Sequence, residues 1–356
     1  MFKLLDGSQT LGRGWTFWSC FLVVLAVALI YPVFADSYDV GNFSYFLIWI
    51  FMALGLCLMW GYGGMLSFGQ TLFFGIAGYS YGVLAINMGG GSTAIIALVL
   101  SIVIAMIAAG ILGYFMIWGG INGIFFGIVT LSATLVLAFF LGQTAGPEWH
   151  IGPARLNGYN GMKGMDPLTI GDYYIEGSAL YYFMVALIVV VYLALRVLVN
   201  SRIGNVIVAT RENPQRAEML GYDVRKYQLL TFVIGSGLAG LSGALYTSWG
   251  QFITPSSIGL PAAAMPIVWV AFSGRSDLTA TLVGSFVLLF GFQTITVYSQ
   301  QAALVLMGAL LLATVMLAPQ GFVLGIGKLV ADRWNARKRS ASSSLPDTSC
   351  LQTDET

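Results

Sequence analysis

Few residues of this 356-residue chain have types and spacings that could do catalytic chemistry. The one histidine, His150, stands beside a tryptophan in a polar stretch, where a lone histidine is usually a surface residue rather than a metal ligand. Gly327-Lys328 resembles the end of a phosphate-binding loop, but Leu329 occupies the position that requires serine or threonine. We therefore expect no enzymatic activity, no metal site and no cofactor bound by this chain.

Charge is concentrated in one interior segment, residues 201–226. This segment carries five basic and three acidic residues, whereas residues 40–147 contain no Asp, Glu, Lys, Arg or His. Apolar runs reach up to both of its ends. A short charged loop between apolar runs is typical of a cytoplasmic loop of a membrane protein. Such a loop is a candidate docking site for a cytoplasmic partner.

The charged loop contains the signals of one short helix. Asn213-Pro214 is typical of a helix start, and Gly221 follows the predicted helix 215–220 as its terminator. The charged residues of this helix fall on different faces, which would leave Ala217 and Leu220 to enter a groove on a partner. An ordinary solvated loop that only determines topology is the alternative, and the spacing alone does not separate the two.

The apolar part of the chain offers no group that could couple transport to an ion gradient. Between Lys226 and Lys328 only Arg275 and Asp277 are charged, and both fall in one short turn. Ion-driven carriers usually keep ionisable residues within their helices, because coupling requires a group that titrates or coordinates the ion. We therefore expect no buried charge, and energy for transport would come from a partner at the cytoplasmic face.

The composition is that of an integral membrane protein. Hydrophobic residues make up 58% of the chain, charged residues 9%, and the mean hydropathy is +0.83. Its apolar runs approach or exceed the roughly 20 residues that cross a bilayer as a helix, and a helix satisfies its own backbone groups in lipid. We predict ten spans, at residues 15–34, 43–60, 66–86, 94–118, 121–142, 179–199, 228–248, 262–273, 279–298 and 301–318.

The first span could be mistaken for a cleaved signal peptide. Val33-Phe34-Ala35 resembles a cleavage site. The apolar run before it is longer than the roughly 7–15 residues of a signal sequence. We therefore expect a retained first helix.

The distribution of charge predicts the orientation of the spans. Basic residues place segment 1–14 in the cytoplasm, and the net positive loop 200–226 belongs on the same side. The loop 143–178 has four acidic residues against two basic ones and belongs outside. Ten crossings by the membrane domain, residues 15–320, then put the basic and partly disordered tail 321–356 in the cytoplasm. Both termini are expected to be cytoplasmic.

Ten spans divide into two halves of five, and an odd number per half gives the halves opposite orientations, as in an inverted repeat. The third span of each half is irregular: 66–86 is interrupted by glycines, and 262–273 is short and contains Pro266. Interrupted helices at matching positions indicate a translocation site. The candidates to line it are polar residues of these segments and their neighbours: Ser67, Gln70, Thr71, Tyr79, Asn122, Ser242 and Tyr246. Interhelical hydrogen bonding is the alternative role for each.

Several blocks of residues resemble the permease family of branched-chain amino acid ABC importers, which also includes urea and short-amide permeases. These blocks are 60–70 (WGYGGMLSFGQ), 201–204 (SRIG), 211–213 (REN), 238–246 (LAGLSGALY) and 318–321 (APQG). Together they extend over most of the apolar part of the chain. The pattern is similar to that of the M-type permease, one of the two different permeases in each importer.

The resemblance implies the large, roughly ten-helix ABC-importer fold in a bacterial-type plasma (inner) membrane. It implies three kinds of protein partner: a second permease subunit, two cytoplasmic ATPase subunits that bind the ATP, and an external substrate-binding protein. The chain would also contact membrane lipid, and no nucleic-acid partner is implied. It further implies that segment 211–221 is a coupling helix that the ATPases move. The residues expected to serve this coupling are Arg211, Glu212, Arg216, Ala217, Glu218 and Gly221.

The resemblance leaves the substrate open. Branched-chain or other hydrophobic amino acids are the first expectation. Urea or short amides are the alternative, because residues 268–271 (VWVA) and Gly274-Arg275 are closer to urea-type members, and Gln70 stands where the family commonly has histidine. A passive channel and an ion-coupled carrier are the rivals from other classes. A channel would tolerate replacement of Glu212 or Gly221, and a carrier would stop when ion gradients collapse.

Overall fold

The computed structural model describes residues 5–7, 9–12, 14–89, 91–170, 173–317, 321–323 and 325. The described chain is an all-α membrane protein, and a helix lies at each of the ten predicted spans. These helices are α2 (Gly14–Phe34), α3 (Ser37–Leu56), α4 (Gln70–Asn87), α5 (Ala94–Trp118), α6 (Ile124–Gly142), α7 (Ser178–Asn200), α10 (Val224–Gly250), α11 (Leu260–Ser273), α12 (Leu278–Tyr298) and α13 (Gln300–Leu317).

Eight of the described helices are long and apolar enough to cross a bilayer by themselves. In this count α3 includes its π-helical extension η1 (Cys57–Tyr62), and α11 includes the preceding 3-10 turn η4 (Pro255–Ser257). The other two, α4 and α13, each have 18 residues. Helix α4 is rich in glycine and tyrosine and lies largely inside the protein, so it needs less apolar surface than a helix facing lipid.

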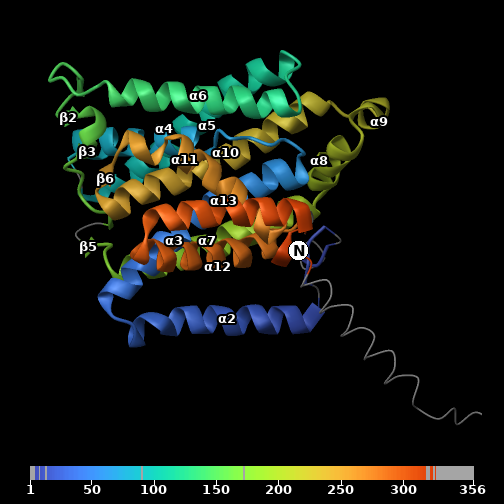
Figure 1. Ribbon diagram of the computed structural model, residues 1–356, viewed down its shortest axis with the longest axis horizontal. Coiled ribbons are helices and arrows are strands. Elements are labelled where there is room, and N and C mark those ends of the chain that lie inside the picture. The colour runs from blue at the N-terminus through green and yellow to red at the C-terminus, as the bar shows by residue number, and fades with distance from the viewer. Residues whose placement is uncertain are drawn as a thin grey trace, which may run out of the picture.

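The contacts between helices agree with two inverted halves. Helices α3 and α10, the second of each half, pack against each other at the centre. Helix α10 packs on α4 and α5 of the first half, and α3 packs on the corresponding α11 and α12 of the second. The first helices depart from this relation. Helix α7 packs on α3, while α2 lies apart at the edge of the bundle, with none of residues 14–34 buried (Figure 1).

The interruption of the third span includes only one of the glycines predicted to break it, Gly69, which is the N-cap of α4. The other three, Gly75, Gly78 and Gly82, do not break α4. Instead they let neighbours approach: a Cβ at Gly78 would come within 2.4 Å of Ile253, and one at Gly75 within 2.3 Å of Ile258. The break comes earlier, where residues 64–69 run without helix between η1 and the start of α4. Glycine spacing alone could not distinguish these two roles, because glycine serves both.

Loops of opposite predicted location lie at opposite ends of the helices (Figure 1). Segment 143–178 forms the short strands β1 (His150–Ile151), β2 (Ala154–Arg155), β3 (Met162–Lys163), β4 (Thr169–Ile170) and β5 (Tyr173–Tyr174), with the 3-10 turn η3 (Gly158–Asn160) among them. Strands β1 and β2 pair, β4 and β5 pair, and β3 pairs with β6 (Phe252–Ile253). The other end carries α8 (Arg202–Glu212), α9 (Pro214–Met219) and the N-terminal segment. The 3-10 turn η2 (Gly91–Thr93) precedes α5.

The prediction of no buried charge was wrong at two residues of the α8 end. Arg196, in the last turns of α7, is fully buried, and Asp277, which caps α12, is 2% exposed. The guanidinium of Arg196 donates to the carbonyl oxygens of Leu5, Leu11 and Gly12 and to the Tyr192 hydroxyl, and it lies over the rings of Phe17 and Trp18. A buried charge persists only with such a set of partners.

The N-terminal segment, residues 5–12, supplies the partners of both buried charges. A carboxylate oxygen of Asp277 accepts from the backbone N–H of Leu11. The Tyr62 hydroxyl donates to the carbonyl oxygen of Gln9 at 3.1 Å, and the N–H of Gln9 donates to Asn200 at 3.2 Å. The segment therefore ties together the ends of η1, α7 and α12. A signal for Arg196 was present in the sequence, since it is the one charged residue within the predicted span 179–199.

Candidate functional site

The helix predicted within the charged loop is present as α9, joined to α8 by a single residue. The side chain of Ser201 accepts from the N–H of Gly204 at 3.3 Å and caps α8. Asn213 is both the end of α8 and the N-cap of α9, where its side chain accepts from the N–H of Arg216 at 2.9 Å. Gly221, with φ +88°, ends the turn in a conformation that favours glycine. Two stiff helices thus meet at one joint.

The apolar residues that α9 presents differ in part from those predicted. Ala217 is buried to 1% exposure, so it anchors α9 to the rest of the protein and is not free to enter a partner's groove. Leu220 is 71% exposed, as predicted, and Met219, which was not predicted, is 87% exposed. The sequence could not show this, because which face of a one-turn helix is covered depends on the rest of the fold. We call Met219 and Leu220 the apolar tip of α9.

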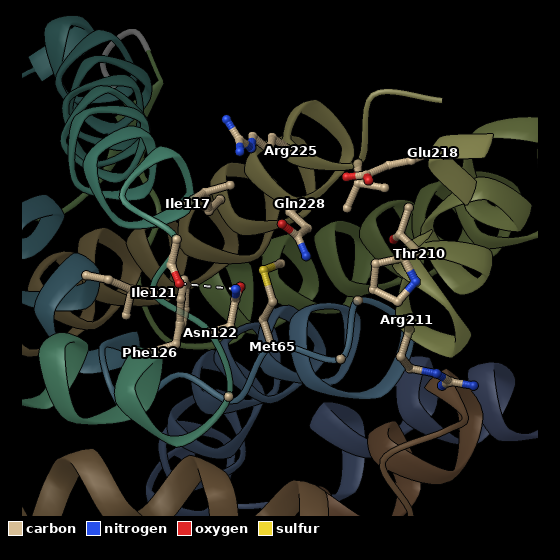
Figure 2. Close-up of a pocket in the computed structure, with 16 residues that line it drawn as sticks. Met65, Ile117, Ile121, Asn122, Phe126, Thr210, Arg211, Glu218, Arg225 and Gln228 are labelled. Carbon is tan, nitrogen blue, oxygen red and sulfur yellow. Dashed lines mark hydrogen bonds between the residues drawn. The ribbon is translucent and has the colours of Figure 1, made fainter. Parts of the chain in front are cut away.

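The charged residues of this region divide into an outward and an inward set. Glu212, Arg216 and Glu218 are exposed. Arg211 turns inward: Nη1 donates to the carbonyl oxygen of Gly61 in η1, while Nε donates to Glu212 at 3.1 Å. Figure 2 shows its guanidinium pointing away from Met65, Asn122 and Gln228 in the middle of the view. The residues predicted to serve coupling therefore differ in their surroundings: Glu212, Arg216 and Glu218 are exposed to solvent, whereas Arg211 contacts η1.

A cavity of about 470 Å³ opens beside α9 (Figure 2). It lies between residues 63–65, the loop from α5 to α6, the joint of α8 and α9, and the start of α10. Its apolar wall includes Met65, Ile117 and Phe126. Asn122 and Gln228 line it as well and lie close to Met65 in the middle of the view. Elements that meet at this cavity have room to shift against one another.

Three of the predicted pathway residues lie together at the start of α4. Ser67, Gln70 and Thr71 are all buried. Ser67 accepts from the N–H of Gly69 at 3.1 Å, and Gln70 Nε2 lies 2.9 Å from the sulfur of Met59. Within the part of the chain that the structure describes, Gln70 Oε1 and Thr71 Oγ1 have no hydrogen-bond partner. Buried polar atoms without a partner are uncommon and mark a place where a water or a polar ligand would be stabilised.

The other predicted pathway residues are dispersed. Tyr79 is buried farther along α4, with a hydroxyl that lacks a partner among the described residues. Ser242 donates to the carbonyl oxygen of Ile48 at 2.8 Å, which is the interhelical hydrogen bond considered as its alternative role. Tyr246 packs in an aromatic cluster, 5.3 Å from the ring of Phe74.

Asn122, the remaining candidate, is exposed in the loop between α5 and α6. Its amide donates to the carbonyl oxygen of Gly120 at 3.2 Å, the bond drawn in Figure 2. It belongs to the cavity beside α9 rather than to the start of α4. One further pattern, residues 78–82 (GYSYG), fits the GxSxG spacing of a hydrolase nucleophile, but it forms the middle of α4 and not the strand-to-helix turn that the motif requires.

Comparison with known proteins identifies the family. Residues 40–315 match the family described as branched-chain amino acid transport system, permease component. The chain belongs to this family. The match covers the whole helical bundle from α3 to most of α13, so the resemblance noted in the sequence blocks is confirmed at the level of the family.

Two relatives from Methanocaldococcus jannaschii are similar to this permease. It is 23% identical to the probable branched-chain amino acid transport permease protein LivM over 273 residues, which is 67% of this chain and 76% of the relative. It is 26% identical to the probable branched-chain amino acid transport permease protein LivH over 157 residues, 41% of this chain and 46% of that relative. No solved structure matches this permease.

Proposed function

We propose that this permease is the M-type membrane subunit of a binding-protein-dependent ABC importer and forms half of the translocation pathway for branched-chain amino acids. The observation that carries the proposal is α9: a short capped helix with an exposed apolar tip, held at the end of a bundle whose helices belong to this family. The longer of the two matches, to the LivM relative, favours the M-type subunit.

In this proposal the end that carries α8, α9 and the N-terminal segment faces the cytoplasm of a bacterial-type cell. Two ATPase subunits dock there and bind the ATP, a second permease completes the pathway, and an external binding protein delivers substrate at the end that carries β1 to β5. ATP binding would move α9 and so switch the bundle between two conformations, which is how a ligand on one subunit biases a bistable element in another.

A coupling helix must present groups that a partner can bury. The tip formed by Met219 and Leu220 is such a group, because exposed apolar side chains gain free energy when a partner covers them. Glu212, Arg216 and Glu218 add exposed charges of both signs to the same segment, which would orient the partner. The role predicted for Ala217 then becomes indirect, as the anchor of α9.

The test is reconstitution of the four-component importer in liposomes with ATP inside and labelled L-leucine outside. We expect uptake that requires ATP and the binding protein and that survives ionophores. Uptake without ATP would support a passive channel, and uptake that ionophores abolish would support an ion-coupled carrier. Competition by unlabelled urea or acetamide, without competition by isoleucine, would move the substrate to the urea and amide class.

The double change Met219→Ser with Leu220→Ser tests the docking role of α9. Losing two apolar contacts from an interface weakens binding by roughly 2–4 kcal/mol, so the ATPases should no longer copurify with the permease. Ile151→Ser is the matched control, since Ile151 is 55% exposed in β1, which pairs with β2 at the opposite end of the bundle (Figure 1). If the ATPases copurify equally well with both variants, α9 is not their docking site.

A further inference from the structure

We propose that Arg211 is a transmission residue, which carries movement of α8 and α9 inward to η1 and the start of α4 instead of contacting the ATPase. The inference rests on the proposed function and assigns to Arg211 a task different from that of its neighbours. It follows from three sets of contacts: those of Arg211 with the α8–α9 joint, with two glycines, and through η1 with Gln70.

Arg211 stands where any displacement of α9 reaches it. It lies in the last turn of α8, and only Asn213 separates the end of α8 from α9. Because Asn213 continues the backbone bonding of α8 and also caps α9, the two helices cannot move independently at this joint. The guanidinium of Arg211 donates to Gly61 in η1 and its side chain is only 31% exposed, so less of it is available to a docked partner than of the exposed Arg216.

The side chain of Arg211 reaches the first half of the protein at two glycines. Gly61 O accepts from Arg211 Nη1. A Cβ on Gly61 would come within 1.6 Å of the carbonyl oxygen of Arg275, so this glycine lets η1 lie against the turn before α12. Gly64, with φ +73°, lies beneath the arginine chain, where a Cβ would be 2.7 Å from Arg211 Cγ. The close approach of Arg211 therefore depends on the absence of a side chain at Gly64.

The bond to Gly61 reaches the buried polar residues through η1. This segment is a π-helix, a geometry that is rare and concentrates at functional positions. Met59 lies in the same segment, and its sulfur is the partner of Gln70 Nε2 at 2.9 Å. A continuous set of contacts therefore runs from Arg211 through Gly61 and Met59 to Gln70. It ends beside the unpartnered oxygens of Gln70 and Thr71.

The cavity beside α9 gives this link room to move. Gly63, Gly64 and Met65 line it from the first half, and Arg211 and Pro214 line it from the α8–α9 joint. A packed interior would resist relative movement of these elements, because close-packed side chains leave no space for displacement. An open volume of about 470 Å³ at the joint removes that resistance.

The first test is the change Arg211→Met in the reconstituted importer. We expect the ATPases to remain bound and to hydrolyse ATP, while leucine uptake per ATP falls about tenfold, the size expected when a hydrogen bond to a charged group is lost. Arg211→Lys should retain an intermediate ratio, since lysine still donates to Gly61 O. Arg216→Met is the matched control: an exposed arginine of α9 whose loss should weaken ATPase binding without changing uptake per ATP.

The second test replaces the link by a covalent bond. In a background with Cys20→Ser and Cys350→Ser, the pair Gly64→Cys and Arg211→Cys would bring two thiols together, since the Cβ built at Gly64 lies 3.4 Å from Arg211 Cβ. That separation is near the range of a disulfide. We expect higher uptake per ATP in the oxidised than in the reduced importer, and reversal on addition of dithiothreitol.

The outcomes separate the two proposals. If the unaltered importer shows no ATP-dependent uptake of leucine, the proposed function fails. If it does, and oxidation of the cysteine pair leaves uptake per ATP unchanged or lowers it, only the role of Arg211 fails. An absence of cross-linking would contradict the close approach of residues 64 and 211, and a loss of ATPase binding in Arg211→Met would assign Arg211 to docking instead.

Discussion

Two arginines at the α8 end of this permease are held in opposite ways. Arg196 is fully buried, and three backbone carbonyls, a tyrosine hydroxyl and two aromatic rings surround its guanidinium. Arg211 has a side chain that is 31% exposed, and it contacts one backbone carbonyl and the carboxylate of Glu212. Both reach across the protein, Arg196 to the N-terminal segment and Arg211 to η1.

The difference indicates which part of the protein can shift during a transport cycle. Moving a buried guanidinium away from its acceptors leaves an unpaired charge in a low dielectric, which costs several kcal/mol. A partly solvated arginine can change its exposure to water at a cost nearer 1 kcal/mol while it keeps its bond to Gly61. Arg196 therefore belongs to a fixed frame formed by the N-terminal segment and the ends of α7 and α12, and Arg211 belongs to a joint that can move, together with η1, against that frame.

The strongest test of the comparison is Arg196→Met. The change removes the donors to the carbonyl oxygens of Leu5, Leu11 and Gly12, so we expect a loss of about 3–5 kcal/mol in unfolding free energy. Thermal unfolding in detergent, followed by tryptophan fluorescence, measures it. The matched change Arg211→Met should lose no more than about 1 kcal/mol. Equal losses for the two variants would abolish the distinction between frame and joint.

Asp277 gives a smaller effect with a defined pH dependence. Burial raises the pKa of its carboxyl above the ordinary value of 3.8, although backbone N–H groups, beginning with that of Leu11, oppose the shift. The folded protein therefore binds this proton more tightly than the unfolded chain. The carboxyl contributes most to stability below its unfolded pKa, and that contribution declines as pH rises toward the folded pKa and is level above it.

The change Asp277→Asn should remove this decline while keeping the cap of α12, because asparagine is an equally good N-cap. The amide can replace only one of the two acceptor oxygens, so the bond from Leu11 is lost, at about 1 kcal/mol. Unfolding temperatures between about pH 4 and pH 7 would be compared with those of the parent. A variant with the parent's pH dependence would show that Asp277 titrates without perturbation in the folded protein.

The sequence predicts the features of the fold that depend on residues close together along the chain, and not those that depend on contacts between distant residues. Helix positions follow from runs of apolar residues, and α9 follows from the local signals of Asn213 and Gly221, so both were predicted. The burial of Ala217 and Arg196 was not. The carbonyl acceptors of Arg196 lie 184 to 191 residues away along the chain, and nothing local indicates that the N-terminal segment returns to it. Of the glycines predicted to interrupt the third span, only Gly69 lies in the break before α4, because glycine both interrupts and packs helices.

The smallest expected effect concerns the side chains of the N-terminal segment. Gln9 is held through its backbone: its carbonyl oxygen accepts from Tyr62 at 3.1 Å, and its N–H donates to Asn200 at 3.2 Å. Its side chain makes only an exposed bond of 3.3 Å to Asn205. Gln9→Ala should therefore change stability by no more than about 0.5 kcal/mol, whereas Tyr62→Phe should lose about 1 kcal/mol with its partly buried hydrogen bond.

Which of these two variants loses more thermal stability shows whether the N-terminal segment is held through its main chain or its side chains. If Tyr62→Phe is the more damaging in thermal unfolding, the segment is bound through its main chain. Many sequences could then serve in residues 5–12, provided that the register places the carbonyls of Leu5, Leu11 and Gly12 on Arg196. If Gln9→Ala is the more damaging, the link from the segment to α8 is part of the frame. The boundary between frame and joint would then lie between α8 and α9, and because Arg211 lies in α8, it could not carry movement of α9 to η1.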